Sequence, residues 1–189
     1  EIDDEGAQVR ENSGDSYRLG LEVDAIINAS DKIKIRPNIA ISRNKNIDFK
    51  SNFDGQLQNF GNTDISYSPN VVAGNIFTYQ PFEFLNFNLL SKYVGEQYMS
   101  NIEADISKLD AYFVNDFNVQ FTITPNRLFK EIVLTGLINN IFGVEYVSNG
   151  YYFSYDDDFS NPGIIETIEG VGYYPQATRN YLVGATLKF

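Results

Sequence analysis

The sequence contains no cysteine, no histidine and no tryptophan. Without cysteine it can form neither a disulfide framework nor a thiolate metal site. Without histidine it lacks the imidazole that serves as the base of Ser-His-Asp triads and as the usual ligand in catalytic zinc sites. We therefore predict a protein that is not an enzyme and that carries no metal and no cofactor.

Long apolar runs and positive charge are also scarce. No run reaches the ~18 apolar residues that mark a membrane-spanning helix. The formal net charge is -11, which repels phosphates, so we predict no nucleic-acid partner. The first residue is Glu1, and no signal peptide is visible. Because the export predicted below requires such a signal, we expect the chain to be part of a longer or processed protein.

The sequence is rich in aromatic residues, with 13 Tyr and 15 Phe. Between Tyr17 and Ala29 the odd positions are apolar, while the even positions are mostly polar. A period of two is typical of a strand with two unlike faces. The other segments that show this alternation are 33–42, 65–79, 85–93, 109–123, 131–141 and 174–189. The sequence therefore predicts seven strands in an all-β protein.

Short and long connections alternate between these strands. The short turns are predicted at Ser30-Asp31, 80–83 and 124–127, and the longer loops at 44–64, 96–108 and 143–172. Outer-membrane barrels have short periplasmic turns, long outer loops and aromatic girdles at both strand ends. A soluble sandwich shares the alternating strands but has no reason to alternate its loop lengths. We therefore predict an antiparallel transmembrane β-barrel segment, comprising about seven strands of a larger barrel.

Four motifs resemble a known family. Residues 138–146, INNIFGVEY, look like the NNLF-x-x-x-Y segment near the end of TonB-dependent outer-membrane receptors. Residues 173–181, YYPQATRNY, resemble their YPQA-x-R-N strand entry, and residues 182–189 resemble their closing G-x-x-L-K-F. Residues 17–22 resemble the family's R-x-G-x-E strand. The motifs VSNGY and YYPQA are similar to those of Bacteroidetes receptors.

The resemblance implies a barrel of about 22 strands closed by an N-terminal plug domain. Residues 1–189 would form the C-terminal part of that barrel, roughly its last third, without the plug. The implied location is the outer membrane of a Gram-negative bacterium. The implied partners are membrane lipid, a TonB complex that binds a part of the protein outside this sequence, and the β-barrel assembly machinery. That machinery would bind the last strand through Gly184, Leu187 and Phe189.

The resemblance also implies energy-dependent uptake of a scarce nutrient, with an iron-siderophore complex as the leading ligand. A structural or adhesive outer-membrane β-barrel protein without transport is the alternative. A plug domain encoded upstream of Glu1 would favour transport, whereas a signal peptide directly upstream would favour the alternative.

Strand parity suggests which polar side chains point into the lumen. These candidates are Arg18, Glu22, Asp24, Lys34, Arg36, Asp110, Asp116, Asn118 and Gln120. Each of them could contact the ligand path, solvate the barrel wall or form cross-strand ion pairs. Glu22, Asp24, Lys34 and Arg36 are expected to pair with one another across the first turn.

The longest predicted loop holds the remaining candidates. Tyr151, Tyr152 and Tyr155 could stack on a ligand, because tyrosine offers a flat amphipathic surface. They could equally pack on one another. The acidic residues 156–158, together with Glu166 and Glu169, match no EF-hand spacing, and we expect them to be solvated.

Overall fold

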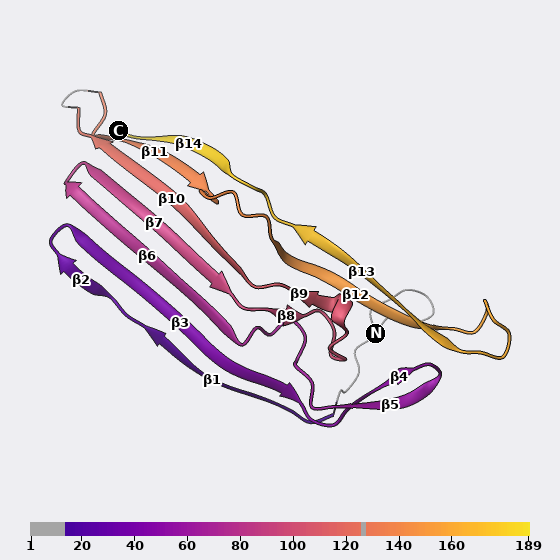
Figure 1. Cartoon of the computed structure of the whole chain (residues 1–189). Coiled ribbons are helices and arrows are strands. Elements are labelled where there is room, and N and C mark those ends of the chain that lie inside the picture. The colour runs from indigo at the N-terminus through magenta and orange to yellow at the C-terminus, as the bar shows by residue number, and fades with distance from the viewer. Residues whose placement is uncertain (1–13, 126–127) are drawn as a thin grey trace.

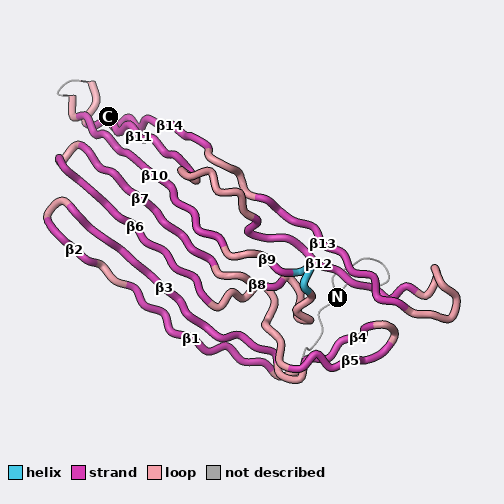
Figure 2. The backbone as a smooth tube through the Cα atoms, in the orientation of Figure 1, coloured by secondary structure: helices cyan, strands magenta, loops and turns pink. Residues whose placement is uncertain are grey.

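The computed structural model describes residues 14–125 and 128–189. One antiparallel sheet dominates it, with the strand order β1-β3-β6-β7-β10-β11-β14 and with β2 alongside β3 (Figure 1). The strands are β1 (Ser16–Asp24), β2 (Ile27–Ser30), β3 (Ile33–Asn46), β6 (Val71–Phe82), β7 (Leu85–Val94), β10 (Tyr112–Ile123), β11 (Glu131–Asn139) and β14 (Asn180–Lys188). β1 and β14 are the two edges, so this sheet is open rather than closed into a barrel (Figure 2).

The seven predicted strands are present, and the first of them is divided into β1 and β2. The interruption lies opposite Pro37 on β3. The amide of Ala25 donates to the carbonyl of Pro37 at 3.0 Å, but proline has no N–H with which to return the bond. The register is the same on both sides of the break, since Asp24 pairs with Asn38 and Ile27 with Ile35.

The short turns lie near the predicted positions but not on them. The first turn is Asp31-Lys32, because Ser30 still pairs with Ile33. The second is Glu83-Phe84, since Phe82 pairs with Leu85 across a register shift that begins after Tyr79. The third predicted turn, 124–127, falls partly outside the described residues.

The three predicted long loops contain strands of their own, so the expectation of plain loops was wrong. β4 (Phe49–Phe53) pairs with β5 (Gln56–Gly61), and β8 (Gln97–Tyr98) pairs with β9 (Lys108–Leu109). β12 (Val147–Asp157) pairs with β13 (Glu166–Pro175), and the 3-10 helix η1 (Asp105–Ser107) precedes β9. All these elements lie beyond one end of the main sheet, opposite the short turns (Figure 1). We refer to that end as the hairpin end.

The end of the chain also differs from the prediction, because β13 contains residues that were predicted to belong to the last strand. Tyr174 belongs to β13, where it pairs with Asn149, and not to the last strand. Pro175 ends β13, because it cannot donate to the ladder. The last strand therefore begins at Asn180.

Cross-strand register collects the apolar side chains on one face of the main sheet. Leu21 lies opposite Ile41, and Val23 lies opposite Ile39. Leu21 is 67% exposed and Ile41 is 53% exposed, so neither side chain is covered by another element. Among the described residues only five hydrophobic side chains are buried, against eight polar ones. The sheet thus has almost no apolar core of its own, and nothing within 14–125 and 128–189 covers its apolar face.

Candidate functional site

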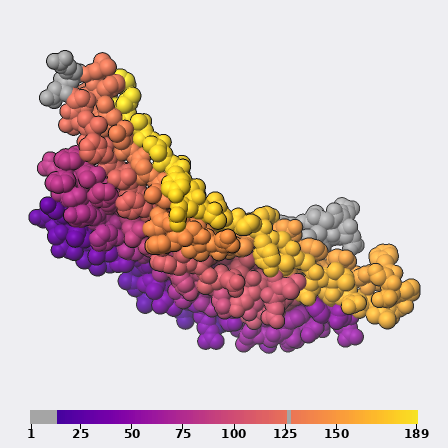
Figure 3. All heavy atoms as spheres, turned by 45° about the horizontal axis from the view of Figure 1, so that its top comes forward, coloured from indigo at the N-terminus to yellow at the C-terminus, as the bar shows by residue number. Residues whose placement is uncertain are grey.

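The polar face of the main sheet carries two hollows. One has a volume of about 620 Å³, and its lining includes Asn38, Lys92 and Asp116. The other has a volume of about 610 Å³ and lies nearer the short turns, where Lys34 and Arg36 line it. The molecule is visibly bowed (Figure 3). The hollows identify the polar face as its concave side.

Two asparagines of the INNIF motif shape the first hollow. Asn140 directly follows β11 and has φ 50°, a left-handed backbone that asparagine tolerates better than most residues. Its amide N–H donates to Asp116 Oδ1 at 2.7 Å, and its side chain donates to the carbonyl of Val144 at 2.8 Å. Asn139 donates to Asn180 Oδ1 at 2.8 Å and so joins β11 to β14. These asparagines, which were absent from the predicted site, organise the chain that follows β11.

Eight of the nine predicted lumen residues lie on this polar face. They are Arg18, Glu22 and Asp24 on β1, Lys34 and Arg36 on β3, and Asp116, Asn118 and Gln120 on β10. Asp110 lies between β9 and β10, outside the sheet. Arg18 donates to Ser68 Oγ at 2.9 Å, and Asn118 accepts from Asn88 at 3.3 Å. A role of these side chains in a ligand path stays a prediction.

The expected ion pairs across the first turn are wrong. None of the ion pairs within 14–125 and 128–189 joins Glu22 or Asp24 to Lys34 or Arg36. The register sets Glu22 opposite Ala40 instead. The neighbours of the two cations on β6 are also uncharged, namely Thr78 and Ile76.

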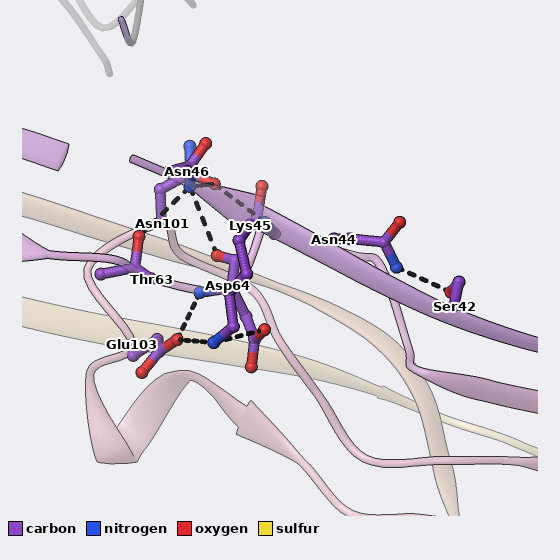
Figure 4. Close-up of polar contacts among 9 residues, drawn as sticks. Ser42, Asn44, Lys45, Asn46, Thr63, Asp64, Asn101 and Glu103 are labelled. Atoms are coloured by element: carbon purple, nitrogen blue, oxygen red, sulfur yellow. Dashed lines mark hydrogen bonds and ion pairs between the residues drawn. The ribbon is translucent and has the colours of Figure 1, made fainter. Parts of the chain in front are cut away.

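A polar network fixes the hairpin end of β3 (Figure 4). Lys45 Nζ lies 2.8 Å from Asp64 Oδ1 and 3.4 Å from Glu103 Oε1, and the amide of Asp64 donates to the same Glu103 oxygen. The side chain of the buried Asn46 donates to Asn101 Oδ1 at 3.4 Å. The segments near residues 64 and 101–103 are thereby tied to the sheet.

The β4–β5 turn docks on the β12–β13 hairpin. Thr167 donates its amide to Asp54 Oδ1 at 2.8 Å, and its hydroxyl accepts from the Asp54 amide at 2.7 Å. The same hydroxyl donates to Asp156 Oδ1 at 2.7 Å, and Gly55 donates to Asp156 Oδ2 at 3.0 Å. Asp156 therefore serves as a hydrogen-bond acceptor between hairpins. Within the described residues no group of three or more potential ligands is placed to hold a metal ion.

A third hollow, of about 570 Å³, lies at the hairpin end and is lined by Tyr67, Gln97, Ser148, Asn149, Gly150, Tyr151 and Tyr174. Tyr67 has φ 53°, which is uncommon for a bulky residue. Its hydroxyl donates to the carbonyl of Gly150 at 3.0 Å. Burial raises the pKa of Tyr67, and the nearby Tyr174 adds to this effect. We call these seven residues the tyrosine hollow.

The three predicted loop tyrosines do not lie together in one hollow. Tyr151 lines the tyrosine hollow, whereas Tyr152 points to the opposite face of β12, where its hydroxyl donates to Glu169 Oε1 at 2.6 Å. Tyr155 is 56% exposed and does not line the tyrosine hollow. Sequence reasoning missed Tyr67 and Tyr174, which lie 107 residues apart and which only the fold brings together.

Tyr152 should ionise late in an alkaline titration. Burial, and secondly its hydrogen bond to Glu169, raise the pKa of its phenol above the usual 10.0. A raised folded pKa means that the stabilisation is complete below about pH 10 and is lost as pH rises through the folded value. Tyrosinate absorbance of the folded protein should show a late step that Tyr152→Phe removes. A late step of full size in that variant would contradict the assignment.

The fold, but not the sequence, matches known proteins. No protein-family model and no curated protein matches the chain. The structure is similar to the siderophore receptor PiuA from Acinetobacter baumannii (TM-score 0.66, 15% identity, covering 90% of this chain and 21% of that one). It is also similar to the ferric-catecholate import receptor Fiu from E. coli K12 (TM-score 0.65, 16% identity, covering 100% and 23%). A further match is the ferric citrate transporter FecA (TM-score 0.59, 17% identity, covering 91% and 24%).

These matches confirm the fold class, an all-β antiparallel sheet built like part of an outer-membrane receptor β-barrel. The chain spans only about a fifth to a quarter of the length of these receptors. Within 14–125 and 128–189, no helix is long and apolar enough to cross a membrane.

Proposed function

We propose that residues 1–189 form the C-terminal part of the barrel of a TonB-dependent outer-membrane receptor, which takes up a scarce nutrient and is not an enzyme. The observation that carries this proposal is the unpartnered apolar face of the main sheet. Leu19, Leu21 and Ile41 are each more than half exposed there, and Val183 on β14 is 91% exposed. Lipid is the partner that accepts such a surface at strand length.

The open edges support the same proposal. A sheet edge in lipid leaves N–H and C=O groups without any partner, so only closed barrels are stable there. β1 and β14 would therefore pair with further strands of the same barrel. Gly184 and Leu187 lie on β14, and the Phe189 ring lies 5.0 Å from that of Phe129. We retain these residues as the signal for the assembly machinery.

The two ends of the sheet then take different roles. The short turns would face the periplasm, and the hairpin end would face outward, as in other barrels of this kind. A ligand would meet the hairpins first and then pass along the concave polar face. The neighbours described as siderophore, ferric-catecholate and ferric citrate proteins support an iron-siderophore complex as the leading ligand. TonB contact and the Bacteroidetes-like character of the motifs stay predictions from the sequence.

A transport assay in cells tests the proposal. The full-length gene should restore iron-limited growth and ⁵⁵Fe accumulation from a matching ferric complex in a receptor-deficient strain, and loss of TonB or collapse of the proton gradient should abolish both. An isogenic strain carrying the empty vector is the control. Surface display of the protein without energy-dependent accumulation of any ferric complex would favour the structural or adhesive alternative.

A further inference from the structure

We infer that the tyrosine hollow is a ligand contact site for an uncharged compound that presents ring faces and hydroxyl or carbonyl groups. The inference rests on the proposed receptor function and narrows the chemistry of its ligand. None of the seven lining residues carries a charge. Three of them offer aromatic rings, and Gln97, Ser148 and Asn149 offer amide and hydroxyl groups. Phenols and amides of this kind bind neutral rings by stacking and by hydrogen bonds.

The ring of Tyr151 is held as a flat platform. A Cβ atom at Gly172 would overlap this ring, so the absence of a side chain there allows the ring to lie against the neighbouring strand. Tyr151 is nevertheless 49% exposed, so about half of its surface remains accessible to a ligand. Tyr174 lies beside it, with ring centroids 6.1 Å apart. Two adjacent and half-exposed rings in fixed positions form a surface for stacking.

Tyr67 gives the hollow a fixed wall from a distant part of the chain. Its hydroxyl donates to Gly150 across 83 positions of sequence, and its amide donates to the carbonyl of Tyr98 at 2.8 Å. Its left-handed backbone, at φ 53°, is the kind of strain that is kept where the surroundings impose it. The hollow is therefore built from three separate connections of the sheet.

The electrostatics of the hairpin end disfavour an anionic ligand. Segment 140–179 carries six carboxylates and one arginine, and segment 95–111 carries four carboxylates and one lysine. Segment 43–70 is balanced, with three of each sign. Two of these cations are already engaged, since Lys45 pairs with Asp64 and Glu103, and Lys108 pairs with Glu96 at 2.8 Å. A negative field of this kind repels anions within a Debye length of about 8 Å.

Binding to the purified full-length receptor tests the inference. The neutral probes are maltohexaose and a neutral ferric trihydroxamate, which separate a glycan source from a ferric source of the same chemistry. The anionic probe is a trianionic ferric tricatecholate. At least one neutral probe should bind about tenfold more tightly than the anionic one, because like-charge juxtaposition is costly. Raising NaCl from about 0.05 to about 0.5 M should strengthen only anionic binding.

A pair of glycine variants locates the site. Gly172→Ala should displace the Tyr151 ring and weaken neutral binding about five- to tenfold, as should Tyr151→Ala. Gly170→Ala is the comparison variant on the same strand, because a Cβ there would overlap Phe153, which does not line the hollow although its ring stacks beside Tyr151 with centroids 6.4 Å apart. It should weaken the binding of neutral probes less than Gly172→Ala, which displaces the Tyr151 ring itself. Heat-modifiable gel mobility would verify that each variant forms a folded barrel.

Three results would overturn the inference. The first is tighter binding of the trianionic probe at low salt than at high salt. The second is unchanged binding of the neutral probes in both Gly172→Ala and Tyr151→Ala, and the third is binding of neither neutral probe. The proposed transport function can be disproved independently of this inference. If the neutral probes bind but no TonB-dependent accumulation occurs, only the transport role is disproved. If a trianionic complex is taken up in a TonB-dependent manner, only this inference is disproved.

Discussion

A Val119→Arg substitution in the full-length receptor should destabilise the barrel by about 2–4 kcal/mol, the cost of an arginine near the bilayer midplane of a barrel wall. Val119 lies well inside β10 and on the apolar face, opposite Phe87 on β7 and opposite Gly136 on β11. An arginine there would face hydrocarbon, and its guanidinium would have to reach distant polar groups. Urea titration of the receptor folded into lipid vesicles measures the loss.

The neighbouring Gln120→Arg is the matched control. Gln120 lies on the polar face, is exposed and pairs with Asn86 and Thr135. An arginine at this position stays in water, so its effect should remain within about 0.5 kcal/mol. The two variants carry the same new side chain one residue apart. Equal losses of stability would show that the two faces have been assigned wrongly.

The sequence predicted the faces of the sheet better than the ends of its strands. Alternation is a property of many consecutive residues, so a boundary error leaves the parity of a long strand intact. The first turn was misplaced by one residue, because Ser30 extends β2 and Asp31-Lys32 make the turn. The shared apolar face of Leu21, Val23, Ile39 and Ile41 follows from the alternation, and the register pairs them as that alternation predicts.

The absence of the predicted ion pairs shows that strand parity alone does not predict which residues are cross-strand partners. Parity places Glu22, Asp24, Lys34 and Arg36 on one face, but pairing also requires the register, which the turn sets. In the observed register Glu22 lies opposite Ala40 and Asp24 lies opposite Asn38, and a pairing of Asp24 with Arg36 would need a shift of two residues. The sequence did not determine the register, so the prediction of mutual pairing had no physical support beyond a shared face.

The hairpin end was the part least accessible to sequence reasoning. The acidic residues 156–158 resemble a solvated loop, and yet Asp156 and Asp157 belong to β12. A signal was available in the alternation of aromatic rings with glycines. Tyr151 pairs with Gly172 and Phe153 pairs with Gly170, and each ring occupies the space that a glycine leaves open. Such ring-over-glycine pairs are a known device for fixing strand register.

Residues 1–189, expressed alone in detergent-free buffer, should not form a monodisperse monomer that unfolds cooperatively. The folded form presents β1 and β14 as two unpaired edges, and open edges template the addition of further strands. The apolar face of the same sheet is uncovered at many positions, with Leu19 at 72% and Val183 at 91% exposure. Contiguous apolar surface of that extent drives association in water.

Detergent should distinguish between the two causes of aggregation, the exposed apolar face and the unpaired sheet edges. Micelles cover the apolar face but cannot supply partners for the backbone groups at the sheet edges. We therefore expect detergent to reduce aggregation while heterogeneous oligomers remain. Light scattering coupled to size exclusion would report the mass distribution, and far-ultraviolet circular dichroism would report the strand content. A sharp monomeric peak with cooperative urea unfolding in plain buffer would mean that the apolar face finds its partner within these residues, and the proposal of a barrel part would then have to be withdrawn.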